Sequence, residues 1–219
     1  RNFLLSITHE LKTPLAAIKL GIQTLQKRQE LKPEQRKPLE QSALSNTERL
    51  HALLDNVLLA TRIESGQHPI QPAPTNLSLL TEKIALETAN ALGKSHLIKL
   101  SIQPDLTVSV DGNAYESMLI NLLENAFKYG DNAPVELELA KTVGEIILSV
   151  KDQGPGIPPD ERKRIFSKFY RMGNEETRSK KGTGIGLFIV KELTELHGGK
   201  VRAEANLPQG SVFKVYLPS

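Results

Sequence analysis

Apolar residues recur at helical spacing through the first 65 residues of the chain. A seven-residue repeat is formed by Leu4, Leu11, Ile18 and Leu25. A second series, with alternating spacings of four and three, runs from Leu39 to Ala60. The polar segment between them, Gln29 to Lys37, contains Pro33 and suits a turn. The pattern therefore predicts a two-helix hairpin.

A hairpin of two amphipathic helices leaves much of its apolar surface in water. Pairing with a second copy into a four-helix bundle would cover that surface. We therefore expect a homodimer formed through residues 1–65.

The composition changes between Gly66 and Asn76, a segment with three prolines. Such a segment is typical of a linker. We expect one domain over residues 1–66, a linker over 67–76 and a second domain over 77–219.

In the second domain, segments of helical period alternate with segments of strand period. The expected helices are Leu77 to Leu92, Asn113 to Tyr129 and Ile185 to Leu196. The expected strands are Ile98 to Ile102, Leu106 to Val110, Val135 to Ala140, Glu145 to Val150, Val201 to Ala205 and Val212 to Leu217. This order predicts an α+β fold in which helices cover one face of a mixed, largely antiparallel sheet.

Composition narrows the function classes. The 219 residues carry a net charge of +3 without a long basic stripe, so we expect no nucleic-acid partner. The absence of cysteine excludes a disulfide framework and a thiol nucleophile. No apolar run approaches the ~18 residues of a membrane helix, so we expect no membrane contact by this chain. Because the chain opens at Arg1 in helical pattern, we expect a cytoplasmic fragment of a parent anchored through an absent N-terminal part.

His9 is a candidate nucleophile. With Leu4 and Leu11 in the bundle seam, His9 points to solvent, and a lone histidine there is more often an ordinary surface residue. Its neighbours favour chemistry: Glu10 could accept a proton from one ring nitrogen while the other attacks. Thr13 lies one turn further on the same face.

Two glycine-rich segments are candidates for phosphate binding. Asp152-Gln153-Gly154-Pro155-Gly156-Ile157-Pro158 follows an expected strand, and Gly182-Thr183-Gly184-Ile185-Gly186-Leu187 opens an expected helix. Glycines before a helix let backbone N–H groups approach phosphates. Either segment alone could be an ordinary turn, and neither fits a P-loop or a dinucleotide-binding motif.

A polar helix face carries the third signal. Asn121, Asn125 and Lys128 share one face, while the apolar residues of the helix point the other way. Amide oxygens suit a magnesium ion and the ammonium suits phosphate, so this face indicates a Mg²⁺–polyphosphate site.

Together these motifs resemble the sensor histidine kinases of two-component systems, over essentially the whole chain. Phe3 to Leu20 is similar to the H-box, Asn121 to Gly130 to the N-box, Asp152 to Pro158 to the G1 box, Phe166 to Arg171 to the F-box and Gly182 to Leu187 to the G2 box. The resemblance implies a Bergerat-type ATP-binding domain, with Met172 to Lys181 as an ATP lid.

The resemblance also implies roles for single residues. His9 would be the phosphoacceptor, Glu10 its proton acceptor, and Asn125 a magnesium ligand with Asn121 beside it. Asp152 would bind the adenine amino group, Tyr129 would line the base pocket, and Lys128 and Arg171 would contact phosphate. A His-Glu-x-x-Thr pattern ending at Thr13 goes with phosphatase activity toward the partner.

The expected function is ATP-dependent autophosphorylation on His9 and transfer to an aspartate of a separate response regulator receiver domain. One alternative is a Bergerat-fold ATPase, which would need a carboxylate where Asn121 stands. The other is a nucleotide-binding dimeric scaffold without kinase activity.

Overall fold

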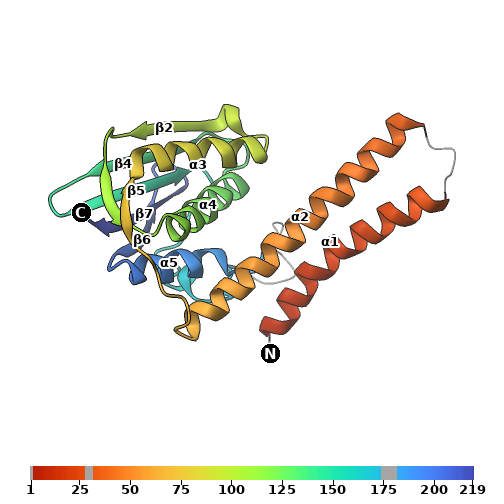
Figure 1. Cartoon of the computed structure of the whole chain (residues 1–219), viewed down its shortest axis with the longest axis horizontal. Coiled ribbons are helices and arrows are strands. Elements are labelled where there is room, and N and C mark those ends of the chain that lie inside the picture. Colours follow the sequence, from red (N-terminus) through yellow and green to blue (C-terminus); the bar gives the residue numbers. More distant parts are fainter. Residues whose placement is uncertain (1, 28–31, 174–181) are drawn as a thin grey trace.

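The computed structural model of the chain describes residues 2–27, 32–173 and 182–219. The side chains of residues 2–6 and of His9 lie outside this description, and so do residues 174–181, most of the predicted lid. The described residues form a long helical hairpin joined to a domain in which helices cover a sheet (Figure 1). This is the predicted fold class.

The hairpin consists of α1 (Asn2–Lys27) and α2 (Pro33–Glu64), which pack against each other. α2 begins at Pro33, earlier than the predicted end of the turn at Lys37, because proline at the first helical position lacks only an N–H that would be unpaired anyway. Among the hairpin side chains that the structure describes, six large apolar ones are exposed: Leu15, Leu20, Ile22, Leu44, Leu54 and Leu58. The single chain therefore leaves part of its apolar stripe uncovered.

The main sheet has five strands in the order β2-β4-β5-β7-β6. Their bounds are β2 Ile98–Ile102, β4 Val135–Lys141, β5 Glu145–Asp152, β6 Lys200–Ala205 and β7 Ser211–Pro218. β2 pairs with β4 in parallel, and the remaining pairs are antiparallel. The sheet is thus mixed and largely antiparallel, as predicted.

A second sheet, of two strands, lies where the chain enters the second domain from the segment that follows α2. β1 (Ala73–Asn76) pairs antiparallel with β3 (Thr107–Val110). β1 occupies the last four residues of the segment predicted as a linker. Its Pro-Thr composition has no strand period, and only the pairing with β3 makes it a strand.

Three helices cover one face of the main sheet: α3 (Leu77–Ala91), α4 (Gly112–Tyr129) and α5 (Gly186–Leu196). Side-chain caps begin two of them. Asn76 Oδ1 accepts from Leu79 N–H, and Asp111 Oδ1 accepts from the N–H groups of Asn113 and Ala114. The apolar face of α4 is fully buried at Met118, Leu119, Leu122, Leu123 and Ala126. Its opposite face is thereby turned toward α5 and the loops.

The lower end of α2 packs on the second domain (Figure 1). Ala60 is fully buried, Ile63 is buried to 9% exposure, and both belong to the domain's core cluster. A salt bridge of 2.5 Å joins Glu64 to Lys168. This contact places the middle of α2 and the start of α1 beside the loops that precede α5.

Candidate functional site

A cavity of about 240 Å³ lies between the polar face of α4, the end of β5, the loops before α5 and the side of α2. Its lining residues are Leu53, Asn56, Asn121, Glu124, Asn125, Lys128, Tyr129, Asp152, Pro155, Gly156, Ile157, Ile165, Tyr170, Arg171, Met172, Gly182, Thr183, Gly184, Gly186, Leu187, Ser211 and Phe213. The three segments singled out from the sequence therefore meet in one cavity.

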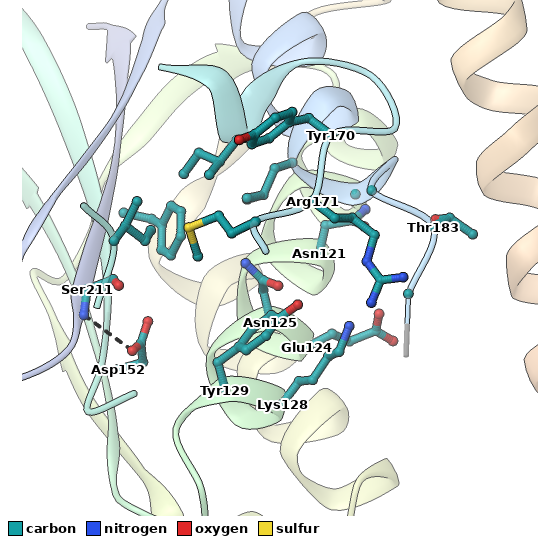
Figure 2. Close-up of a pocket in the computed structure, with 18 of the residues that line it drawn as sticks. Asn121, Glu124, Asn125, Lys128, Tyr129, Asp152, Tyr170, Arg171, Thr183 and Ser211 are labelled. Carbon is teal, nitrogen blue, oxygen red and sulfur yellow. Dashed lines mark hydrogen bonds between the residues drawn. The ribbon is translucent and has the colours of Figure 1, made fainter. Parts of the chain in front are cut away.

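Asp152 is a buried carboxylate at the end of β5, with 3% of its surface exposed. Its Oδ1 accepts from the N–H of Gly154 at 2.8 Å. It also accepts from the N–H of Ser211 at 3.2 Å (Figure 2). Desolvation raises the pKa of Asp152 above its ordinary value, although these two bonds oppose the rise. With Oδ1 engaged, Oδ2 can accept a hydrogen bond from a ligand in the cavity.

Several glycines here are required by close packing. A Cβ on Gly154 would lie 2.8 Å from Tyr129 O, and one on Gly184 would lie 2.7 Å from Tyr170 O. Gly184 also has a φ of +72°, which side chains disfavour. A Cβ on Gly186 would lie 2.5 Å from Asn121 Oδ1, so this glycine lets the start of α5 approach α4.

The polar face of α4 forms one wall of the cavity. Asn121 Nδ2 donates to Ser117 O at 2.8 Å, which fixes the amide and turns its oxygen toward Gly186. Asn125 lines the cavity one turn further on. Two amide oxygens on one wall fit Mg²⁺, which takes a few protein oxygens and completes its shell with phosphates and water.

Lys128 carries a perturbed ammonium. Burial lowers its pKa to about 8, and the nearby charges of Arg171 and Arg49 act in the same direction, whereas Glu10 and Glu124 oppose them. Figure 2 shows the charged ends of Lys128, Glu124 and Arg171 gathered on one side of the cavity. This side is the cationic end of the site, opposite Asp152.

Glu124 was missed by the sequence reasoning. It follows Asn121 by one turn, lies four residues before Lys128 and lines the cavity. Desolvation raises the pKa of Glu124 above its ordinary value, and Lys128 opposes the rise. The i,i+4 spacing to Lys128 was a usable signal.

Glu10 reaches the second domain from α1. Its carboxylate is only 5% exposed, and its Oε1 accepts from Gly182 N–H at 2.8 Å. Its Oε2 lies 3.5 Å from an Nη of Arg49 on α2. The side chain of His9, one residue earlier in α1, lies outside the described part of the structure.

The remaining predicted residues line the cavity, lie buried behind it or, in the case of Thr13, lie on α1. Those lining the cavity are Tyr129, Gly156, Ile157, Arg171, Gly182, Thr183 and Leu187. Gly154 and Ile185 are buried behind it, Gly154 as a donor to Asp152 and Ile185 as a core residue. Thr13 is half-buried in α1. Leu53 and Asn56 of α2 were not predicted, because nothing local in α2 indicates that it borders a cavity of the other domain.

Two family models match the chain. Residues 1–66 match the His Kinase A (phospho-acceptor) domain, and residues 110–219 match the histidine kinase-, DNA gyrase B- and HSP90-like ATPase.

Similar curated proteins include sensor protein KdpD of Clostridium acetobutylicum, 34% identical over 99% of this chain and 24% of the relative. Another is the circadian input-output histidine kinase CikA of Synechococcus elongatus, 32% identical over 99% of this chain and 30% of the relative. The chain spans about a quarter of the first of these relatives and less than a third of the second.

Solved structures share the fold. The histidine kinase AdeS of Acinetobacter baumannii superposes with a TM-score of 0.72 at 22% identity, covering 96% of this chain and 97% of that one. Full-length ShkA, solved in complex with AMPPNP, gives a TM-score of 0.66 at 29% identity over 98% of this chain and 45% of that one. Among the described residues, no helix is both long and apolar enough to cross a membrane.

The fold and the cavity define an ATP-binding kinase core attached to a phosphoacceptor hairpin. The chain belongs to the sensor histidine kinase family, and its two matched domains are those of a protein-histidine kinase. The predictions of family, fold class and enzyme class are confirmed. The domain limits and the roles of single residues stay predictions.

Proposed function

We propose that this kinase core phosphorylates itself on His9 with ATP and passes the phosphoryl group to an aspartate of a separate response regulator. One observation carries the proposal. Glu10, the neighbour of His9, is bonded to Gly182 at the cationic end of the cavity. The helix that bears the phosphoacceptor thus touches the site that binds ATP.

The cavity orients the nucleotide from both ends. Asp152 Oδ2 accepts from the adenine amino group, and Tyr129 lines the base pocket. Lys128 and Arg171 neutralise phosphate at the other end, where the N–H of Gly182 also lies. Asn125, with Asn121 beside it, would hold Mg²⁺, which would supply neutralisation of the phosphate charge.

The chemical step is an in-line transfer. One imidazole nitrogen of His9 bonds to the γ-phosphorus as the bond to the leaving ADP oxygen breaks. The proton on the other ring nitrogen passes to Glu10. Positioning and electrostatics supply most of the rate enhancement, because phosphoryl transfer demands little covalent chemistry from the protein.

Labelling with ATP carrying γ-³²P tests this function. Acid-labile, base-stable label on the protein that is lost in His9→Gln supports it. Rapid release of free phosphate without label on the protein would favour the ATPase alternative. The absence of both label and free phosphate would favour the scaffold. His51→Gln is the matched control, because His51 is an exposed histidine on α2. Label that persists in His9→Gln would refute the assignment of the phosphoacceptor.

Residues 1–65 form the dimer in this proposal, and transfer occurs within one chain, because Glu10 contacts Gly182 of its own chain. Mixed dimers of an Asn125→Ala chain with a His9→Gln chain separate the two routes. Neither chain of such a dimer can phosphorylate itself, so label in the heterodimer would show transfer between chains and refute the in-chain route.

Phosphatase activity toward the regulator is the second proposed activity. Thr13 lies one turn after His9 on α1, where its hydroxyl could orient a water toward a phospho-aspartate. Thr13→Ala should keep autophosphorylation and lose dephosphorylation of the regulator. A parallel loss of both activities would indicate damage to α1 instead, since proline follows at position 14.

A further inference from the structure

Glu10 is a carboxylate placed where the nucleotide's phosphates are expected. Its Oε1 takes the N–H of Gly182, the first residue of the glycine-rich segment before α5, at 2.8 Å. The two residues are 172 positions apart in the chain, so the contact exists only because the hairpin docks on the ATP-binding domain. A backbone N–H beside a helix start is a donor that suits a phosphate oxygen.

Cations surround the same point. A Cβ built on Gly182 would lie 2.6 Å from Lys128 Nζ, so the ammonium lies against this glycine. Arg49 approaches Glu10 Oε2 at 3.5 Å, and Glu10, Arg49 and Arg171 all act on the pKa of Lys128. One N–H and the guanidinium of Arg49 therefore contact a single carboxylate, and the cationic groups of Lys128 and Arg171 lie close by, which is the environment of a phosphate group.

Among the described residues, the Glu10 carboxylate forms hydrogen bonds with only one of its two oxygens. Its side chain is buried, yet within the described part of the chain Oε2 has no hydrogen-bond partner. A buried charge whose second oxygen has, in these described ranges, only a 3.5 Å ion pair with Arg49 and no hydrogen bond costs free energy that a well-fitted ion would not. A terminal phosphate offers more oxygens to the same donors and carries more charge.

We infer that the Glu10 carboxylate occupies the position at the Gly182 N–H that a phosphate oxygen of ATP would take. Glu10 and the nucleoside triphosphate therefore compete for this N–H. ATP must displace the carboxylate from Gly182 in order to place its terminal phosphate there. By the same linkage, ATP binding releases Glu10 to serve the neighbouring His9. The inference rests on the proposed function, which places the phosphates at this end of the cavity.

The test measures the equilibrium affinity of the whole chain for Mg²⁺–AMPPNP by calorimetry in three variants. Glu10→Ala removes the carboxylate, and Glu10→Asp keeps the charge but is one methylene too short for Gly182. Both variants should bind Mg²⁺–AMPPNP about tenfold tighter, because the nucleotide no longer has to break one charge-assisted hydrogen bond between Glu10 and Gly182. Glu48→Gln, an exposed charge change beside Arg49, is the matched control and should bind like the wild type.

AMP separates competition from a general effect on the site. AMP lacks the terminal phosphates, so its affinity should be the same in all variants. A Glu10→Asp chain that binds AMPPNP like the wild type would overturn the inference, because the carboxylate would then act through its charge alone. Equal tightening for AMP and AMPPNP would overturn it too. Failure of the wild type to bind AMPPNP would instead refute the proposed site, and the inference with it.

A second measurement reads the contact itself. The ¹⁵N–¹H resonance of the Gly182 amide should shift in Glu10→Ala without nucleotide, and it should shift in the wild type when AMPPNP is added but not when AMP is added. An amide that is indifferent to Glu10→Ala would overturn the inference even if the variant changed affinity by other means.

Discussion

The pKa of Lys128 leads to a pH dependence of nucleotide affinity. Burial and two neighbouring guanidinium groups lower this pKa to about 8 in the free protein, against 10.5 for an ordinary lysine. Phosphates beside the ammonium favour its charged form, so ATP binding raises the pKa again. Below pH 8 the site is charged before ATP arrives. Above pH 8 binding must first take up a proton, and affinity falls as pH rises.

The magnitude follows from the protonated fraction. With a pKa of about 8, roughly nine in ten molecules carry the charge at pH 7 and roughly one in ten at pH 9. The apparent dissociation constant scales inversely with that fraction, so it should rise about tenfold between these pH values.

The assay is calorimetric titration with Mg²⁺–AMPPNP at pH 7 and pH 9 in buffers of different ionisation enthalpy. The wild type should take up close to one proton per nucleotide at pH 9 and almost none at pH 7. Lys128→Arg is the matched control, because a guanidinium stays charged at both pH values and the affinity should then change little. The same pH dependence in Lys128→Arg, or its absence in the wild type, would refute the reasoning.

The remaining predictions concern the base pocket, the start of α4 and the dimer. Asp152→Asn should weaken AMPPNP binding by about a hundredfold in calorimetry, because an amide donor would face the adenine amino group; an unchanged affinity would exclude Asp152 as the adenine acceptor. Asp111→Ala should lower the free energy of unfolding by about 1–2 kcal/mol in urea titrations, since Asp111 caps α4 and accepts from Gln71 N–H. Desolvation raises the pKa of Asp111, but these N–H bonds outweigh it and lower the pKa below its ordinary 3.8. The stabilisation by Asp111 is therefore present above pH ~4 and is lost below it. A stability difference between Asp111→Ala and the wild type that does not change with pH would contradict this. Leu58→Glu on α2 should yield monomers in light scattering, whereas Leu79→Glu, also exposed but on α3, should leave the dimer intact; a Leu58→Glu dimer would contradict the proposed interface.

Local periodicity determined most of the secondary structure. The apolar repeats fix α4 and α5 to within one residue of the predicted starts, because burial of one face decides where a helix forms. Alternation did the same for β4 and β5. β1 escaped prediction, since its four residues are a strand only through pairing with β3.

The sequence by itself also determined the class of chemistry. Asn121, Asn125 and Lys128 lie on one helix face through spacing alone, and Asp152 with its glycines follows a strand end. These patterns depend only on residues that are close together in the sequence, so they can be recognised without the structure. They lie within the residues that match the ATPase family model.

Only the tertiary structure decided which distant groups join that site. Glu10 meets Gly182, Arg49 approaches Glu10, and Leu53 and Asn56 line the cavity, because Ala60 and Ile63 bury against the second domain. No spacing in the sequence encodes such a contact, since it depends on how the end of α2 is buried against the other domain. The same docking brings Arg49, which lowers the pKa of Lys128, and Glu10, which opposes it, whereas the place of Lys128 on α4 follows from helical periodicity.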